Sequence, residues 1–287
     1  MGYYLSPGRD VGIMGYTSLF KERLYFSAGL FNGDGDDGSA RGNEHDEPEV
    51  AARVVVVPFK MVNNRWLESL HLGCSGTFVK ADNLNIDLRV KSSGMAGTSR
   101  NIYELTHNTK FGVIENVDDR IRTGIEAAWA SGPFALQAEK RWFTYSGLDP
   151  AGSTPKSDAE FSNWYLSAAL ALTGETHYFS NGLLKSIYPN SFFNPSENTW
   201  GAFVLALRMD HFSGDEDWIN PASHVSVKEA DAFSIAMNWI MFPMCRIVAD
   251  YSFTDFSDKI KVRVLPDGST DYIDKENCLT LRLAMDF

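Results

Sequence analysis

The last ten residues of the chain alternate strictly between large apolar side chains and small, polar or charged ones. In residues 278–287, CLTLRLAMDF, an apolar residue occupies every second position from Leu279 to Phe287. Because successive side chains of a β-strand point to opposite faces, this strand has one apolar face and one wet face. Its length of about ten residues is what a tilted strand needs to cross a hydrocarbon layer. A soluble edge strand can show the same alternation, so the rest of the chain has to decide between the two interpretations.

The same period of two recurs along most of the chain. Runs of alternating or β-branched residues, bounded by turn-forming and charged residues, predict about twelve strands in all. The expected segments before the terminal strand are 9–18, 23–32, 49–59, 66–79, 84–91, 120–130, 133–143, 161–172, 201–210, 232–241 and 245–253, with a further strand near 109–114 as the alternative to one long loop over 92–118. We therefore expect an all-β fold, an antiparallel transmembrane β-barrel that forms a single domain over residues 1–287.

The connections and the tryptophans agree with a membrane barrel. Short and long connections alternate in the C-terminal half, with 254–275 expected as a long loop, although 173–198 is too long for a simple turn. In a soluble sandwich, large aromatic residues would lie in the middle of strands more often; here they lie near strand ends, where two aromatic girdles would meet the membrane surfaces. These residues are Trp129, Trp200 and Trp239 toward the short turns, and Trp142 and Trp164 toward the long loops.

Composition excludes several other classes of protein. A hydrophobic content of 44% excludes a disordered chain, and a net charge of −11 argues against a nucleic-acid partner. No apolar run approaches the 18 residues of a transmembrane helix. The N-terminus has no basic segment followed by an apolar one, although an outer-membrane protein must be exported. Either the export signal and some early strands are absent from this chain, or the barrel interpretation is wrong.

No catalytic or metal-binding motif appears in the sequence. The six histidines are scattered, and there is no GxSxG, P-loop or HExxH motif. The three cysteines are too widely spaced for a metal site or a disulfide framework, and the Asp- and Gly-rich stretch 33–49 lacks the complete spacing of a calcium loop. We expect no enzyme activity, no cofactor and no metal.

The polar faces of the expected strands are rich in arginine. If each apolar face meets lipid, the opposite face lines a lumen and carries Arg53, Arg89, Lys91, Arg120, Arg122, Arg141, Arg208, Arg246 and Arg282. The acids on the same faces are Asp87, Glu126, Glu139, Asp210, Asp250 and Asp286. Arginine binds carboxylate and phosphate through its planar fork, and rings of basic residues favour anions in pores. The alternative is that these arginines pair with the lumen acids and brace the wall.

Several stretches resemble the phosphate-selective porin O/P family. They are GRDVGIMGY and LYFSAGLFNGDG within 8–35, LHLGCSG at 70–76, GIEAAWASGPFALQAEKRWF at 124–143, WYLSAALALTGETHYF at 164–179 and GAFVLALRMD at 201–210. The resemblance covers most of the chain in order. It implies a 16-stranded, usually trimeric barrel in the outer membrane of a Gram-negative cell, in contact with its lipid and lipopolysaccharide. It also implies an arginine-lined channel that passes phosphate, polyphosphate or other small anions, and that the N-terminal strands are missing here.

The expected function is an outer-membrane porin for small anions, working by facilitated diffusion. Weak binding at successive arginines would replace part of an anion's hydration shell and still allow release. Three alternatives stay open: a general porin with little selectivity, a non-transporting barrel that sheathes a partner, and a soluble β-sandwich or lectin-like module.

Overall fold

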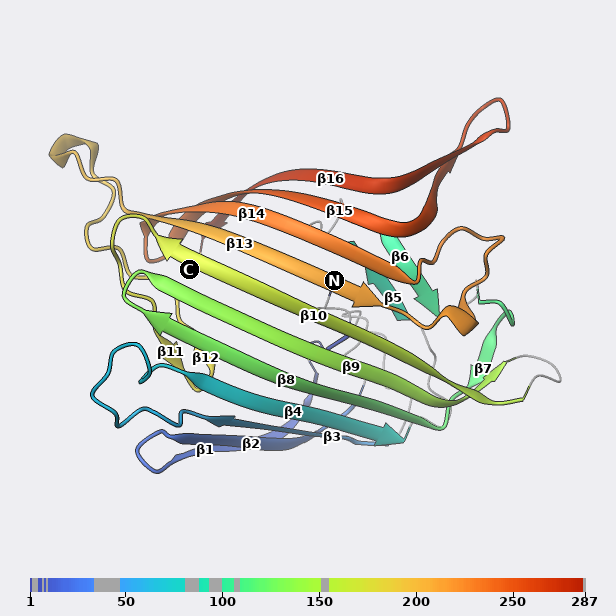
Figure 1. Cartoon of the computed structure of the whole chain (residues 1–287), viewed down its shortest axis with the longest axis horizontal. Coiled ribbons are helices and arrows are strands. Elements are labelled where there is room, and N and C mark those ends of the chain that lie inside the picture. The colour runs from blue at the N-terminus through green and yellow to red at the C-terminus, as the bar shows by residue number, and fades with distance from the viewer. Residues whose placement is uncertain are drawn as a thin grey trace.

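Eleven strands form one continuous antiparallel sheet in which each strand pairs with its neighbours in chain order (Figure 1). The computed structural model describes residues 1, 5, 6, 8, 10–33, 47–80, 88–92, 100–105, 109–150 and 155–285. The strands are β1 (Gly12–Leu19), β2 (Leu24–Phe31), β3 (Glu49–Val56), β4 (His71–Lys80), β8 (Asp119–Ser131), β9 (Phe134–Pro150), β10 (Ser157–Ala171), β13 (Ala202–Ser213), β14 (Glu229–Phe242), β15 (Cys245–Val264) and β16 (Thr270–Met285). A twelfth strand, β7 (Ile114–Asn116), pairs with β9. The predictions of an all-β antiparallel fold and of about twelve strands are confirmed.

The sheet has two edges in the described part of the chain. β1 and β16 stand at the two ends of the strand order and each has one neighbour. No helix in the described residues combines the length and apolarity needed to span a membrane.

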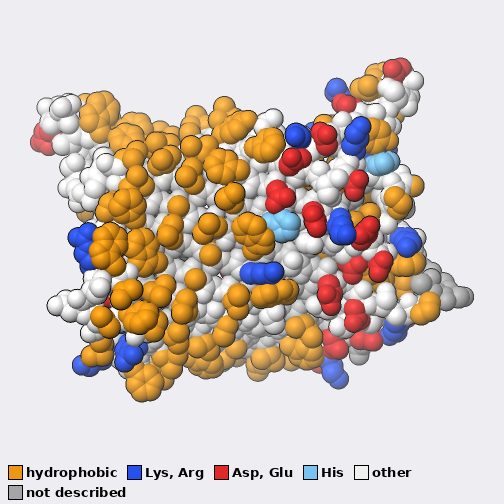
Figure 2. All heavy atoms as spheres, in the orientation of Figure 1, with side chains coloured by type: hydrophobic (Ala, Val, Ile, Leu, Met, Phe, Trp, Pro, Cys, Tyr) orange, Lys and Arg blue, Asp and Glu red, His pale blue; other side chains and the backbone are white. Residues whose placement is uncertain are grey.

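The sheet has two chemically different faces. The outer face carries alternating exposed apolar side chains, such as Leu136, Leu166 and Leu281. The inner face carries the charged residues of the same strands. Figure 2 looks onto the outer face, where apolar side chains cover a broad band and acidic and basic side chains gather toward one end. The period of two in the sequence produces this separation directly.

Connections at the two ends of the sheet differ. At one end, the turn end, three tight turns (20–23, 132–133 and 243–244) accompany two longer connections, 57–70 and 172–201. The opposite end, the loop end, carries the connections 32–48, 81–118, 151–156, 214–228 and 265–269. The 172–201 insertion contains β11 (Phe179–Ser180), β12 (Leu183–Leu184) and the 3-10 turn η2 (Pro195–Glu197), and η3 (Glu216–Trp218) lies at the loop end. Long connections therefore occur at both ends, which the expected alternation did not include.

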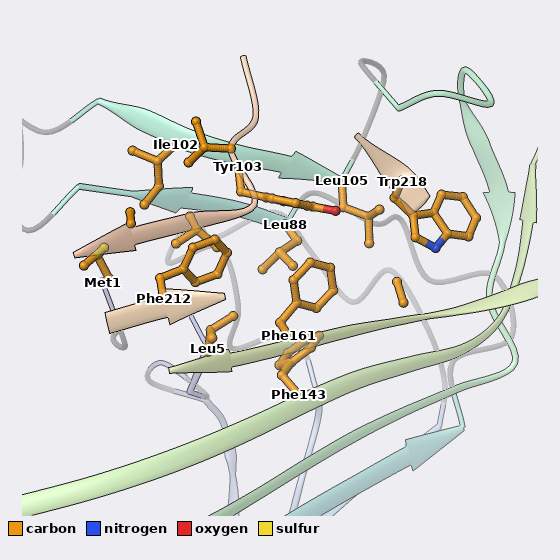
Figure 3. Packing of buried hydrophobic residues seen from close by; sticks show 14 of the residues in the cluster. Met1, Leu5, Leu88, Ile102, Tyr103, Leu105, Phe143, Phe161, Phe212 and Trp218 are labelled. Atoms are coloured by element: carbon orange, nitrogen blue, oxygen red, sulfur yellow. The ribbon is translucent and has the colours of Figure 1, made fainter. Parts of the chain in front are cut away.

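An apolar cluster fills the inner face toward the loop end (Figure 3). Phe143, Phe161 and Phe212 project from β9, β10 and β13. A separate two-stranded hairpin of β5 (Leu88–Lys91) and β6 (Asn101–Leu105) packs against them, with Tyr103 fully buried. The hairpin lies behind the main sheet in Figure 1. The inner face of β9, β10 and β13 is therefore covered at the loop end.

Two sequence predictions about these elements were wrong. The described part of segment 84–91 is β5, which pairs with β6 and not with the main sheet. Segment 254–275 is not a loop: β15 continues to Val264, β16 begins at Thr270, and the turn is 265–269. Apolar alternation fades there because the pairing of β15 with β16 shifts register between Asp255 and Ile260 and again between Lys261 and Arg263. The Asp residues at 34, 36 and 37 lie outside the described residues.

Candidate solute path on the inner face

Charged residues on the inner face form adjacent rows across the strands. In the strand register, Arg53 and Arg141 belong to one row, together with Ser27, Ser75 and Gly124. The next row toward the turn end holds acidic residues and a tyrosine; its members are Glu126, Glu139, Tyr165 and Asp210. A row of arginine thus lies directly beside a row of acid, which places opposite charges within reach of each other.

Two ion-pair groups cross over β4 and join β3 to β8. Arg53 donates two hydrogen bonds to the carboxylate of Glu126, at 2.7 and 2.9 Å. Glu49 accepts from Arg120 and Arg122, each at 2.7 Å, and all three side chains are almost completely buried. β4 must leave room beneath them, and a Cβ at Gly73 would lie 2.4 Å from a carboxylate oxygen of Glu126. The small residues of β4 therefore permit these bridges.

A second group of paired charges follows on β9, β10 and β13. Arg141 donates to Glu139 at 2.6 Å through its Nε, and Arg208 donates to Asp210 at 2.6 Å in the same way. Both guanidinium groups face the ring of Tyr165, at 5.8 Å for Arg141 and 3.8 Å for Arg208. Each ion pair joins residues two apart on one strand, and the contacts with Tyr165 connect the pairs across β9, β10 and β13.

A pocket of about 240 Å³ opens on the inner face between the ion pairs of β3 and β8 and the Arg141–Glu139 pair of β9. Three arginines line it, Arg53, Arg122 and Arg141, together with the single acid Glu139. Hydroxyl groups add further donors to the same lining. The hydroxyl-bearing residues of the lining are Ser6, Ser27, Ser75, Thr77 and Thr123. Apolar residues such as Leu5 and Phe31 complete the lining, so the pocket places three guanidinium groups, which suit an oxyanion, beside apolar surface.

The remaining predicted residues lie elsewhere. Arg246 lies on β15 and Arg282 on β16, where Arg282 is paired with Val248, two residues beyond Arg246. Neither arginine makes a hydrogen bond or ion pair with another described residue. Beside them, Thr280 donates to Asp250. Arg89 and Lys91 belong to β5, so they are not part of the sheet wall. The predicted acids Asp87 and Asp286 lie outside the described residues.

Three features of the site were missed from the sequence. Glu49 was expected at the junction of the acidic stretch 33–49 and the strand 49–59 but not among the wall acids, yet it pairs with two arginines. The tip of the 172–201 insertion reaches the wall, where the carbonyl of Asn181 accepts from Arg53 at 3.1 Å. Tyr165 was read as one more strand residue. Alternation within β10 already placed Tyr165 on the polar face, so that signal was available.

These features can be compared with known proteins. The sequence profile of the family described as "Phosphate-selective porin O and P" matches residues 6–287. The chain belongs to this family. It is 25% identical over 249 residues to Porin O of Pseudomonas aeruginosa, covering 82% of this chain and 53% of that protein. An uncharacterised protein of Caulobacter vibrioides is 25% identical over 266 residues, covering 90% of this chain and 48% of that protein. The chain spans about half the length of these relatives.

A solved porin structure is also similar, with a TM-score of 0.45 and 10% identity, covering 95% of this chain and 61% of that one. Membership of the porin O and P family places the chain in the outer membrane of Gram-negative bacteria. The outer face of the sheet is accordingly the face that meets lipid.

The tryptophans of this porin-family sheet lie where the membrane surfaces are expected. At the turn end, the indole of Trp129 donates to the carbonyl of Trp66 at 2.7 Å, and that of Trp239 donates to the carbonyl of Trp200 at 2.6 Å. Each bond satisfies an indole N–H that would be costly to leave unpaired near lipid. The long connections 57–70 and 172–201 thus supply partners for the wall tryptophans.

Proposed function

We propose that this protein forms an outer-membrane pore through which small anions, including phosphate and related oxyanions, diffuse down their gradient. The observation that carries the proposal is the pocket lined by Arg53, Arg122 and Arg141 together with serine and threonine residues. Two further arginines, Arg246 and Arg282, stand nearer the turn end on the same inner face. No covalent step is involved.

The pocket favours anions without holding them tightly. Each of its three arginines already donates to a carboxylate, Glu126, Glu49 or Glu139. An incoming oxyanion would therefore share donors with these acids and replace only part of its hydration shell. Passage requires binding that is favourable enough for entry and weak enough for release. The paired acids compete with the anion for the arginines, and this competition keeps anion binding weak enough for release.

Family membership suggests that the protein contacts membrane lipid and further copies of itself. Because the resemblance implies a trimer in contact with membrane lipid and lipopolysaccharide, we propose that three copies assemble side by side, each with its own path. The β5–β6 hairpin would narrow each path at the loop end, since it packs on β9, β10 and β13.

The test is the reversal potential of the purified protein in a planar bilayer under a KCl gradient, followed by titration with phosphate. We expect anion-selective current that phosphate blocks. In Arg141→Gln the blocking concentration should rise about tenfold, as expected for the loss of one charge-assisted hydrogen bond. Arg263→Gln is the matched control, because Arg263 is exposed and pairs with Asp271 on the projecting β15–β16 hairpin. Its block should equal that of the unaltered protein.

A second candidate function, a general porin of weak selectivity, is favoured by one observation. Five wall arginines are held by acids: Arg53, Arg120, Arg122, Arg141 and Arg208. Unselective current would support this candidate and remove the phosphate assignment. Absence of any current from correctly folded protein would instead favour a barrel that encloses a partner.

A further inference from the structure

One row of residues on the outer face passes from apolar to charged as it crosses the sheet. In the strand register the row runs Val54, Cys74, Ile125, Lys140, Trp164, His211, Asp231 and Asp255. Strands of a membrane barrel are tilted by about 35–45° from the barrel axis. A row at right angles to the strands therefore changes depth in the membrane, from the hydrocarbon layer toward the surface. The row therefore leaves the hydrocarbon layer between Ile125 and His211. Lys140 and Trp164 lie at that crossing.

Lys140 is an exposed cation beside the apolar band. Its Nζ lies 5.2 Å from the centre of the Trp142 ring, two residues farther toward the loop end. No ion pair joins it to another described residue. Its neighbours in the row are Ile125, 54% exposed, and Trp164, 38% exposed. A lysine in this setting extends its stem along apolar surface and holds its ammonium group at the level of the lipid headgroups.

Asp231, the nearest acid in the row, already has a hydrogen-bond partner in His211. His211 stacks on Trp164, with ring centres 5.8 Å apart, and its Nδ1 lies 2.8 Å from the carboxylate of Asp231. Asp255, next in the row, pairs with Lys275 at 3.6 Å. The acids of the row beyond Trp164 thus have partners on neighbouring strands, and the ammonium group of Lys140 is left to the lipid.

We propose that Lys140, flanked by Trp142 and Trp164, binds the phosphate of an anionic lipid headgroup in the leaflet that meets the loop end. The ammonium group supplies the charge and the two indoles fix the depth of the lipid, since tryptophan favours the membrane interface. The proposal rests on the outer-membrane placement of the chain and not on the transport function, because Lys140 faces away from the inner-face pocket.

The test is native mass spectrometry of the protein released from mild detergent, with phosphatidic acid as the probe and diacylglycerol of the same chain length as the phosphate-free comparison. Lys140→Gln should weaken phosphatidic acid binding about fivefold, the effect of one basic residue near a membrane surface. Lys140→Arg should restore it. Lys80→Gln is the control, since Lys80 is exposed opposite Asp119 at the loop end of β4.

Three results would overturn the proposal. They are unchanged binding of phosphatidic acid in Lys140→Gln, an equal loss of both lipids, and a change of oligomeric mass with lipid binding unchanged. The last would identify this face as an interface between copies. Ion conductance of Lys140→Gln should equal that of the unaltered protein, so failure of the lipid site and failure of the proposed pore are distinguishable.

Discussion

At the scale of single residues, His177 makes the 172–201 insertion sensitive to acid. It is 5% exposed, and neither ring nitrogen has a hydrogen-bond partner in the described part of the chain. Burial lowers its pKa, against an opposing effect of Glu175. Because the folded pKa lies below the unfolded value of about 6.5, the neutral ring stabilises the fold above that pH, and this stability is lost as pH falls below it.

We therefore expect limited proteolysis of the insertion to accelerate between pH 7.5 and 5.5. His177→Leu should remove most of this acceleration, and cleavage products can be assigned by mass spectrometry. If the acceleration persists in His177→Leu, the titrating group is another one, and His71, which lies 5.5 Å from the Phe179 ring, is the next to replace.

Single residues also mark the limit of prediction from sequence. Alternation alone placed Arg53, Arg141 and Arg208 on one face of their strands, and they lie on the inner face of the sheet. The acids that pair with the wall arginines could not be predicted from alternation. Glu49 lies two strands away from Arg120 in the sheet order, so that pair depends on a register which no local pattern encodes.

At the scale of elements, Tyr103 anchors the β5–β6 hairpin on the wall. Its ring makes edge contacts with Phe161 at 5.1 Å and Phe212 at 5.9 Å, and its hydroxyl donates to the carbonyl of Asp215 at 2.7 Å. Tyr103→Ala should free the hairpin, because removing a buried aromatic ring costs about 3–5 kcal/mol. We expect larger single-channel conductance with more open-state noise. Tyr103→Phe keeps the ring contacts, so its conductance should stay near that of the unaltered protein.

The same hairpin explains why one element was assigned wrongly. A strand with one buried and one wet face has a period of two whether its apolar side meets lipid or a protein core. The pattern of residues 88–91 fits both cases. Leu88 and Val90 are buried in the inner cluster, so the apolar side of β5 meets a protein core and not lipid. The part of β15 beyond Asp255 shows the opposite error, since its register shifts against β16 interrupt the period of two that would have revealed a strand.

At the scale of the whole molecule, the orientation of the sheet in the membrane follows from its two ends. Tight turns occur at one end, together with Met285 near the close of β16, and the charged connections and the long β15–β16 hairpin occur at the other (Figure 1). Short turns face the periplasm in barrels of this kind. Alternation could predict that strands cross, but it did not predict that the long connections 57–70 and 172–201 share the end of the tight turns.

A labelling experiment tests this orientation. Asp267→Cys places a thiol in the turn between β15 and β16 at the loop end, and Met244→Cys places one in the tight turn between β14 and β15 at the turn end. Both are made with Cys74, Cys245 and Cys278 replaced by serine, so that the introduced thiol is the one that reacts. A membrane-impermeant maleimide should label position 267 in intact cells. Position 244 is 63% exposed, so it should react once the outer membrane is permeabilised. Labelling of position 244 alone in intact cells would reverse the orientation, and would move the lipid-binding lysine to the periplasmic leaflet.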